Sequence, residues 1–263
     1  MTGKRRVALG GRWLDEMDER IICQGIETGS GSAQVSTVTR FGGSGSRVTN
    51  VHRASLPVTV KFSIRVKRGD LQARSEIYEA VMSWAGRALY GAWLTVNYKE
   101  NRRIWVRLTE APAEEDLWDW TKTYNIRFTA YGVPYWQEAS GTTGSTGTGT
   151  SGSVGLAVGG NAKTVADVVL ENRSGANIAT ATINIGGNVM SFTDLGLGGG
   201  ESLRIGHDEE GLLFIRIGGR SAMAKRTDGS CNDFQVDGGT AVSCSFSAQR
   251  ACVMTVSCAG RFL

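Results

Sequence analysis

Apolar and polar residues alternate in several parts of this chain, which predicts a fold dominated by β-strands. The longest alternation covers residues 56–67, where every second residue is apolar and most of the intervening residues are polar or basic. A period of two gives a strand one buried face and one solvated face. Shorter alternations at 103–108 and 124–131 predict further strands in the same half of the chain.

One segment has helical periodicity instead. Residues 70–86 begin with Asp70, a favourable N-cap residue, and end at Gly86, which suits the C′ position after a helix. Between them, apolar residues recur at the spacing of one helix face. We predict that this face packs into the core through Leu71, Tyr78, Val81 and Met82.

A low-complexity segment divides the chain. Residues 140–153 contain only Gly, Ser and Thr, which have no large apolar side chain to bury, so we predict a flexible linker at 139–153. All 7 Trp and all 6 Tyr precede this segment. The shift in composition separates a first domain at 1–138 from a second domain at 154–263.

The second domain has short apolar runs at regular spacing, separated by turns rich in Gly, Asn and Asp. This pattern is typical of an antiparallel β-sandwich. The predicted fold class is therefore mainly β, with one helix in the N-terminal domain and none in the C-terminal domain.

Basic residues concentrate in one part of a chain whose net charge is only +4. No Asp or Glu occurs between Glu27 and Asp70, and residues 40–55 are rich in Gly and Ser, which predicts a long hairpin or mobile arm. The candidate residues of a subunit-interface arm are Arg40, Arg47, His52 and Arg53. The candidate residues of a basic strand face are Lys61, Arg65, Lys67 and Arg68. The same charges would also suit an ordinary solvated face with its loops.

The sequence offers little for catalysis or metal binding. Neither His52 nor His207 occurs in a nucleophile–base or zinc-ligand spacing, so each is interpreted as a solvated loop residue. The 5 Cys lack C-x-x-C spacing, which predicts reduced and buried thiols. We predict no enzyme activity, no catalytic residue, no cofactor and no metal.

Two further classes are disfavoured. The N-terminal residues do not resemble a signal peptide, and no apolar run is long enough to span a membrane, so cytoplasmic synthesis is expected. The second domain has no Trp or Tyr, and most of its Phe residues fit strand interiors. A carbohydrate site built on an aromatic platform is therefore not expected there.

Several segments follow one another in a characteristic order. In the first domain they are VKFSIRVKRGD followed by LQARSEIYEAVMSWAG, then LTVNYKENRRIWVRLTE, then YNIRFTAYGVPYWQE. In the second domain, SCNDFQVDGGTAVSCSF precedes CVMTVSCAGRFL. This order resembles the distal tail protein (Dit) family of long-tailed bacteriophages, the siphovirus-type tail component. Gly238-Gly239-Thr240 stands where the family usually has Gly-x-Asn.

The resemblance implies a tail-tube-like N-terminal β-sandwich or barrel with one helix and a galectin-like C-terminal β-sandwich. It also implies a virion structural protein at the tail tip, made in the host bacterial cytoplasm. Such proteins form a ring, commonly a hexamer, that joins the tail tube to the distal tail or baseplate hub and leaves a channel for DNA.

The implied partners are further copies of the chain, the tail tube protein on one side and a tail-tip protein on the other, with no membrane insertion. The galectin sugar motif H-x-N-x-R is absent, because Asp208 and Glu209 follow His207. A tail adhesin that binds a host surface glycan through the C-terminal sandwich is the main alternative function. A cell-wall hydrolase and a tail-tube subunit are two others.

A ring requires two complementary patches on each copy. The basic segment at 40–68 and the acidic stretches at 15–19 and 110–119 are candidates for these patches. We predict that the arm at 40–55 packs on a neighbouring subunit.

Overall fold

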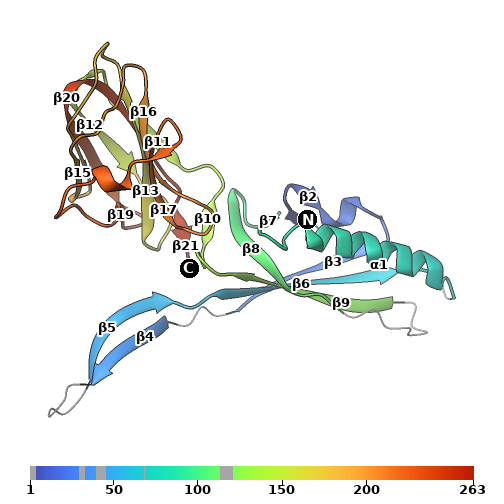
Figure 1. Cartoon of the computed structure of the whole chain (residues 1–263). Helices are drawn as coiled ribbons and strands as arrows, with labels where there is room; N and C mark the ends of the chain where they lie inside the picture. The colour runs from blue at the N-terminus through green and yellow to red at the C-terminus, as the bar shows by residue number, and fades with distance from the viewer. Residues whose placement is uncertain (1–3, 30–32, 40–45, 68, 113–120) are drawn as a thin grey trace. The chain divides into compact units, whose positions relative to one another are not determined.

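The computed structural model describes residues 4–29, 33–39, 46–67, 69–112 and 121–263. The chain is mainly β, which confirms the predicted fold class (Figure 1). It divides into two units, Met1–Tyr135 and Trp136–Leu263. The main run of strands in each unit comes from that unit, and the second unit has a hydrophobic core of its own.

The first unit is built on an antiparallel sheet with the strand order β2-β1-β7-β8-β9-β6-β3. Two more strands, β4 and β5, pair with each other in a separate two-stranded sheet, which no other described strand joins. The strands of this unit are β1 (Val7–Leu9), β2 (Arg12–Trp13), β3 (Ile21–Thr28), β4 (Ala33–Thr39), β5 (Ser46–Arg53), β6 (Leu56–Arg65), β7 (Ala92–Val96), β8 (Arg102–Glu110) and β9 (Thr121–Ala130).

Strand β6 confirms the longest alternation in the sequence. It lies between β3 and β9, and its apolar residues Val58, Val60, Phe62 and Ile64 are all buried. Phe62 stacks on Tyr124 of β9 with ring centroids 5.2 Å apart. The alternations at 103–108 and 124–131 likewise form β8 and β9.

Helix α1 (Leu71–Gly86) confirms the helical segment, and the side chain of Asp70 caps it by accepting a hydrogen bond from the Ala73 N–H. Figure 1 shows the helix lying along the sheet of its unit. Trp84 is buried and meets Phe128 of β9 edge-on, with ring centroids 6.2 Å apart.

Two details of the helix prediction are wrong. Leu71 lies in the first turn with 53% of its surface exposed, and the buried face instead includes Ile77 and Trp84 beside Tyr78 and Val81. Gly86 is the last helical residue and not a left-handed C′ residue. The helix ends in tight i→i−3 turns, in which the Ala88 N–H donates to the Ala85 carbonyl.

The second unit is an antiparallel sheet, folded around one hydrophobic core, with the strand order β15-β14-β20-β13-β16-β17-β18. Strands β11 and β12 also pair with β20, while β19 pairs with β13 and β10 with β21. The strands are β10 (Trp136–Glu138), β11 (Thr142–Ser145), β12 (Gly149–Ala157), β13 (Thr164–Asn172), β14 (Ala181–Ile185), β15 (Asn188–Phe192), β16 (Ser202–His207), β17 (Leu213–Ile217), β18 (Arg220–Ser221), β19 (Gln235–Val236), β20 (Ala241–Cys258) and β21 (Arg261–Phe262).

Strand β20 belongs to both layers of this sandwich. Its first half, up to Ala248, pairs with β14 and with most of β12. Its second half, from Cys252, pairs with β11 and β13, and Gly149 at the start of β12 lies opposite Cys252. The two apolar runs on either side of Gln249 and Arg250 form one 18-residue strand, because the chain changes pairing partner at this polar stretch without a turn.

The predicted linker at 139–153 is wrong, because strands β11 and β12 occupy most of it and pair with β20. Its small residues allow close approach between backbones. A Cβ at Gly152 would lie 2.9 Å from the Phe246 ring, and one at Gly141 would overlap the backbone carbonyl of Cys258. Glycine here reflects tight packing against β20 and not flexibility.

Candidate functional site

Strands β4 and β5 form a hairpin that extends the β3–β6 ribbon of the first unit (Figure 1). The register runs from Ala33 opposite Arg53 to Thr39 opposite Ser46, with a bulge after Ser36. The described residues provide no third strand for this sheet. The hairpin predicted for residues 40–55 is therefore larger than expected, because Ala33–Thr39 forms its first strand.

The hairpin exposes apolar side chains. Val35, Val38 and Val48 are 52%, 57% and 53% exposed. An isolated two-stranded hairpin is at best marginally stable in water, and unpaired strand edges are ready to pair with another chain. The hairpin thus combines two features of a surface that a partner covers: exposed apolar residues, and a two-stranded sheet that no other described strand extends.

The four candidate arm residues have different locations. Arg40 lies outside the described residues, and Arg47 and His52 lie in β5 with side chains that are outside the described part. The guanidinium of Arg53, at the base of the hairpin, lies 4.8 Å from the centroid of the Tyr135 ring. Arg53 therefore packs within its own unit.

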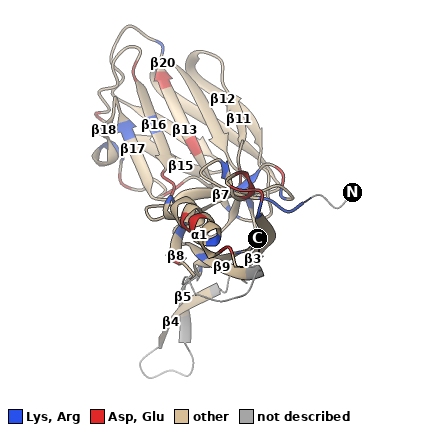
Figure 2. Cartoon of the chain, turned by 90° about the vertical axis from the view of Figure 1, so that its right-hand side faces the viewer, with Lys and Arg blue, Asp and Glu red and all other residues tan. Residues whose placement is uncertain are grey.

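The residues of the candidate basic strand face also differ in their surroundings: some are paired with carboxylates and others are exposed to solvent. Lys61 forms an ion pair with Glu27 on β3, and the nearby Arg127 on β9 forms one with Glu110. Arg65 and Lys67 are exposed, and Arg68 lies outside the described residues. Figure 2 shows basic and acidic residues lying close together in the first unit. On β3, β6 and β9, neighbouring carboxylates thus neutralise part of the basic charge.

The acidic stretch at 15–19 is largely engaged within the first unit. Arg6 donates from Nε to both carboxylate oxygens of Asp15 at 3.0 Å and from a terminal nitrogen to Glu16 at 2.7 Å. Arg20 donates two hydrogen bonds to Asp18, which lowers the pKa of that carboxyl. Most of the second acidic stretch, residues 113–119, lies outside the described part. Most carboxylates at 15–19 are therefore already paired within the unit, and few remain to attract basic residues of a neighbouring subunit.

His207 is not the solvated loop residue that the sequence suggested. It ends β16 with a side chain only 7% exposed, where its Nδ1 lies 3.0 Å from Asp167 and its Nε2 lies 2.9 Å from Asp233. Burial alone would lower its pKa, but the hydrogen bonds and charges of the two carboxylates outweigh burial and raise the pKa to about 9. The residue is a buried imidazolium that holds β13 and the 233 loop to β16, and no nucleophile–base pair is formed.

No group of three or more His, Cys, Asp or Glu in the described part of the chain is arranged to hold a metal ion. Cys23, Cys244, Cys252 and Cys258 are buried free thiols, as predicted, whereas Cys231 is half-buried. Burial raises the pKa of Cys258 to about 11. Among the described helices, none is long and apolar enough to cross a membrane.

Sequence reasoning missed the valines of the hairpin, although a signal was present. Residues 33–39 and 46–53, AQVSTVT and SRVTNVHR, have β-branched residues recurring among polar ones. Their high Ser, Thr and Gly content favoured a structureless arm. The segments differ from a core strand in that Val35, Val38 and Val48 are more than half exposed among the residues that the structure describes.

Comparison with known proteins gives a likeness of fold. No family model and no curated protein sequence matches the chain. Among solved structures, the Dit protein of phage SPP1, described as a hub of the adsorption apparatus in phages that infect Gram-positive bacteria, is similar with a TM-score of 0.68 and 13% identity over 98% of this chain and 99% of that chain.

Two structures of the baseplate of phage P2, in an activated conformation with Ca or Sr, are similar at 7% identity, with TM-scores of 0.48 and 0.47. They cover 96% and 97% of this chain and 97% and 98% of theirs. Both TM-scores are below 0.5, so the likeness of fold is drawn from the SPP1 protein alone.

Proposed function

We propose that this chain is a non-enzymatic structural protein of a bacteriophage tail tip. In this proposal, copies of the first unit close into a ring, most simply of six, that joins the tail tube to the distal tail or baseplate hub. The ring would leave a channel through which DNA passes. The observation that carries the proposal is the β4–β5 hairpin, whose valines and strand edges have no cover among the described residues.

The hairpin suits a cyclic assembly. A ring is made by head-to-tail contacts, in which one patch of each copy meets a different patch of the next. A projecting hairpin provides the first patch, because a neighbour can pair with its edge or bury Val35, Val38 and Val48. Burial of these valines, and not the attraction of opposite charges, would then stabilise most of the contact between subunits.

The ion pairs of the first unit suit a channel for DNA. A surface with many free Lys and Arg side chains would hold phosphates tightly and slow their passage. Lys61 and Arg127 are each paired with a glutamate, so the strand face that they share carries less free positive charge than the sequence indicates. This face can line a channel without trapping DNA.

The likeness to the SPP1 protein supports the proposal from a second direction. It extends over nearly the full length of both chains, so both units and their order along the chain are shared. That protein is described as a hub of an adsorption apparatus. Tail tube protein on one side and a tail-tip protein on the other are the partners that the proposal assigns to this chain.

Native mass spectrometry and negative-stain electron microscopy of the purified full-length chain test the proposal. We expect closed rings of one stoichiometry. A chain that stays monomeric at high concentration would overturn the ring, and long open tubes would favour a tail-tube subunit. Adding purified tail tubes then tests placement, because the rings should cap one end of each tube.

A further inference from the structure

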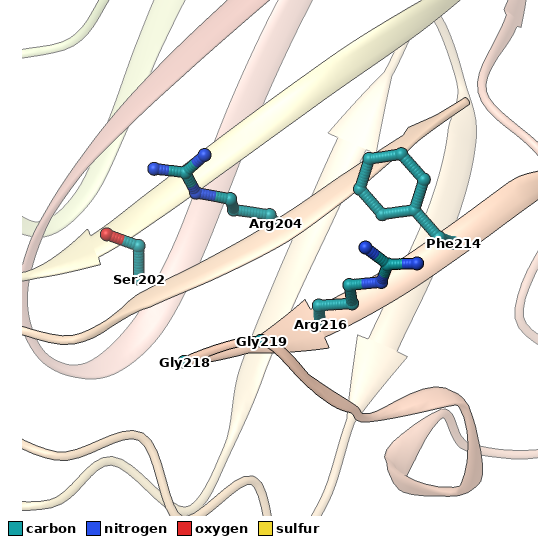
Figure 3. Close-up of a pocket in the computed structure, with 6 residues that line it drawn as sticks. All are labelled: Ser202, Arg204, Phe214, Arg216, Gly218 and Gly219. Carbon is teal, nitrogen blue, oxygen red and sulfur yellow. The ribbon is translucent and has the colours of Figure 1, made fainter. Parts of the chain in front are cut away.

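The second unit has a hollow of about 400 Å³ on strands β16 and β17, near the turn that leads to β18 (Figure 3). Its lining residues are Ser202, Arg204, Phe214, Arg216, Gly218 and Gly219. This volume lies within the range of small-ligand pockets, roughly 300–1,000 Å³. Alternation along both strands sends Leu203, Ile205, Ile215 and Ile217 into the core, so the lining side chains project from the opposite face.

Two arginines on neighbouring strands line this hollow. Arg204 on β16 is directly opposite Arg216 on β17 in the strand register. Like charges at directly opposite positions of a sheet destabilise it. Neither guanidinium has an ion pair or hydrogen bond with any residue that the structure describes. The pair therefore places two cations, neither with an ion pair among the described residues, at directly opposite positions on one face of the sheet.

Nearby carboxylates are engaged elsewhere. Glu201 accepts a hydrogen bond from the Gly198 N–H at 2.7 Å, and Glu171 pairs with Arg173 at 2.8 Å. Asp167 accepts from both the backbone and the ring of His207. The protonated His207 thus holds a carboxylate that could otherwise offset the positive charge of the two arginines.

Phe214 keeps one of the arginines in position. The Arg216 guanidinium lies 4.9 Å from the centroid of the Phe214 ring, a cation–π distance. The ring itself lies over Gly206, where a Cβ would come within 2.8 Å of the ring edge. Figure 3 shows Arg216 beside the ring and Arg204 directed to the side of Ser202. The hollow is thus a built arrangement of two cations, one hydroxyl and one aromatic ring.

We propose that this hollow binds an oxyanion, a phosphate or carboxylate group carried on a small polyol or saccharide. Guanidinium groups donate parallel hydrogen bonds that match the geometry of such oxyanions, and the Ser202 hydroxyl adds a donor. The volume accommodates one such unit, either free or at the end of a surface polymer. The inference goes beyond the proposed tail-tip role and does not depend on ring formation, because every residue involved belongs to the second unit.

Isothermal titration calorimetry on the full-length chain tests the site. The probes are glycerol 3-phosphate and glucuronate, with glycerol and glucose as uncharged counterparts. We expect saturable binding of one or both anionic probes, weakened by added salt, and none of the uncharged ones. Arg204→Gln and Arg216→Gln should each weaken binding by about tenfold or more, because each removes a charge-assisted hydrogen bond.

Arg250→Gln is the matched control, because Arg250 is an exposed arginine on β20 of the same unit. Its affinity for the anionic probes should equal that of the unmodified chain. Lack of saturable binding, equal binding of glucose and glucuronate, or affinity unchanged in both lining variants would each overturn the proposal. Much tighter binding of an acidic peptide than of either small anion would also overturn it, in favour of a protein partner. A polymer that ends in the same anionic group is tested in the same way. Polymer binding that the lining variants weaken identifies a polymer end as a ligand, whereas binding of the small probes alone identifies the free unit.

Discussion

The two units differ in how fully their β-strands are paired and covered by the same chain. In the second unit, the long strand β20 pairs with four other strands and its apolar residues lie in one core. In the first unit, β4 and β5 pair with each other and with no other strand in the described part of the chain, and they leave three valines exposed. One unit completes its sheet from its own chain, while the other presents a sheet that another molecule could complete.

This difference suggests that the two units have separate roles, one in subunit assembly and the other in ligand recognition. A self-sufficient sandwich can present a small polar hollow, since its stability does not depend on the residues that line the hollow. An unfinished two-stranded sheet is stabilised only when a neighbour covers it. We therefore assign oligomer formation to the first unit and ligand binding to the second, and the experiments below test that division.

The largest effect is expected from charges placed on the hairpin. Val35→Asp, Val38→Asp and Val48→Asp together should convert the ring to monomer, because three carboxylates would be desolvated in the subunit interface. Native mass spectrometry measures the result.

The matched control is Val189→Asp on β15, since Val189 is also a partly exposed valine but belongs to the second unit. It should leave the oligomer intact. A ring that survives the triple substitution would remove the hairpin from the interface. Arg53→Glu is a poorer probe, because Arg53 packs on Tyr135 and its loss would also disturb folding.

Removing the core tryptophan of α1 should act on the first unit alone. Trp84→Ala removes a buried ring whose indole N–H donates to the Arg12 carbonyl at 2.8 Å. We expect a loss of about 3–5 kcal/mol from the unfolding free energy of the first unit. Calorimetry should show one transition shifted and that of the second unit unchanged.

The control for this substitution is Leu71→Ala in the same helix. Leu71 is mostly exposed, so the change should cost no more than about 0.5 kcal/mol. If Trp84→Ala shifted both transitions equally, the two units would unfold as one and the division of labour would lose its physical basis.

The buried imidazolium makes the second unit sensitive to high pH. The pKa of His207 rises from 6.5 to about 9 on folding, so between these values the folded chain holds a proton that the unfolded chain has lost. The stabilisation is complete below pH 6.5 and is lost as the pH rises through 9. It amounts to roughly 2–3 kcal/mol, allowing for the partial exposure of the two carboxylates.

Urea unfolding of the unmodified chain and of His207→Gln, at pH 6 and pH 10, measures this contribution. The difference in stability between the two chains should shrink at pH 10, and groups that titrate in both chains cancel. A difference that does not change with pH would mean that His207 is neutral in the folded chain.

The smallest effect concerns thiol reactivity. Cys231 is half-buried and the other four cysteines are buried, so a thiol reagent should modify Cys231 first in the folded chain. Cys23 is the sole cysteine of the first unit, and its modification reports opening of that unit. Mass spectrometry of labelled peptides over time resolves the two sites. Faster labelling of Cys258 than of Cys231 would contradict the burial of β20.

The sequence predicted the fold best where one strand face contacts a core made by the same chain. The alternation around Phe62 and the cap at Asp70 are local patterns, and both led to the correct element. The prediction was wrong around Gly152, where a segment of Gly, Ser and Thr suggested a flexible linker although it packs against β20. Their partner is about a hundred residues away, so no local pattern reveals it.

The candidate sites were harder to predict for the same reason. His207 looked like a solvated loop residue, because Asp167 and Asp233 come from distant segments. Arg204 and Arg216 each looked like an ordinary outward residue of its strand. Only the register between β16 and β17 places them opposite each other.

Strand β20 has a consequence for how the protein is made. Residues as early as Thr142 pair with Cys258, so strands β11 and β12 must wait for the last long strand before they find a partner. Such distant pairings slow folding. On the ribosome, the first unit can mature while the second is still an open chain, which would give the exposed hairpins time to find one another before the sandwiches close.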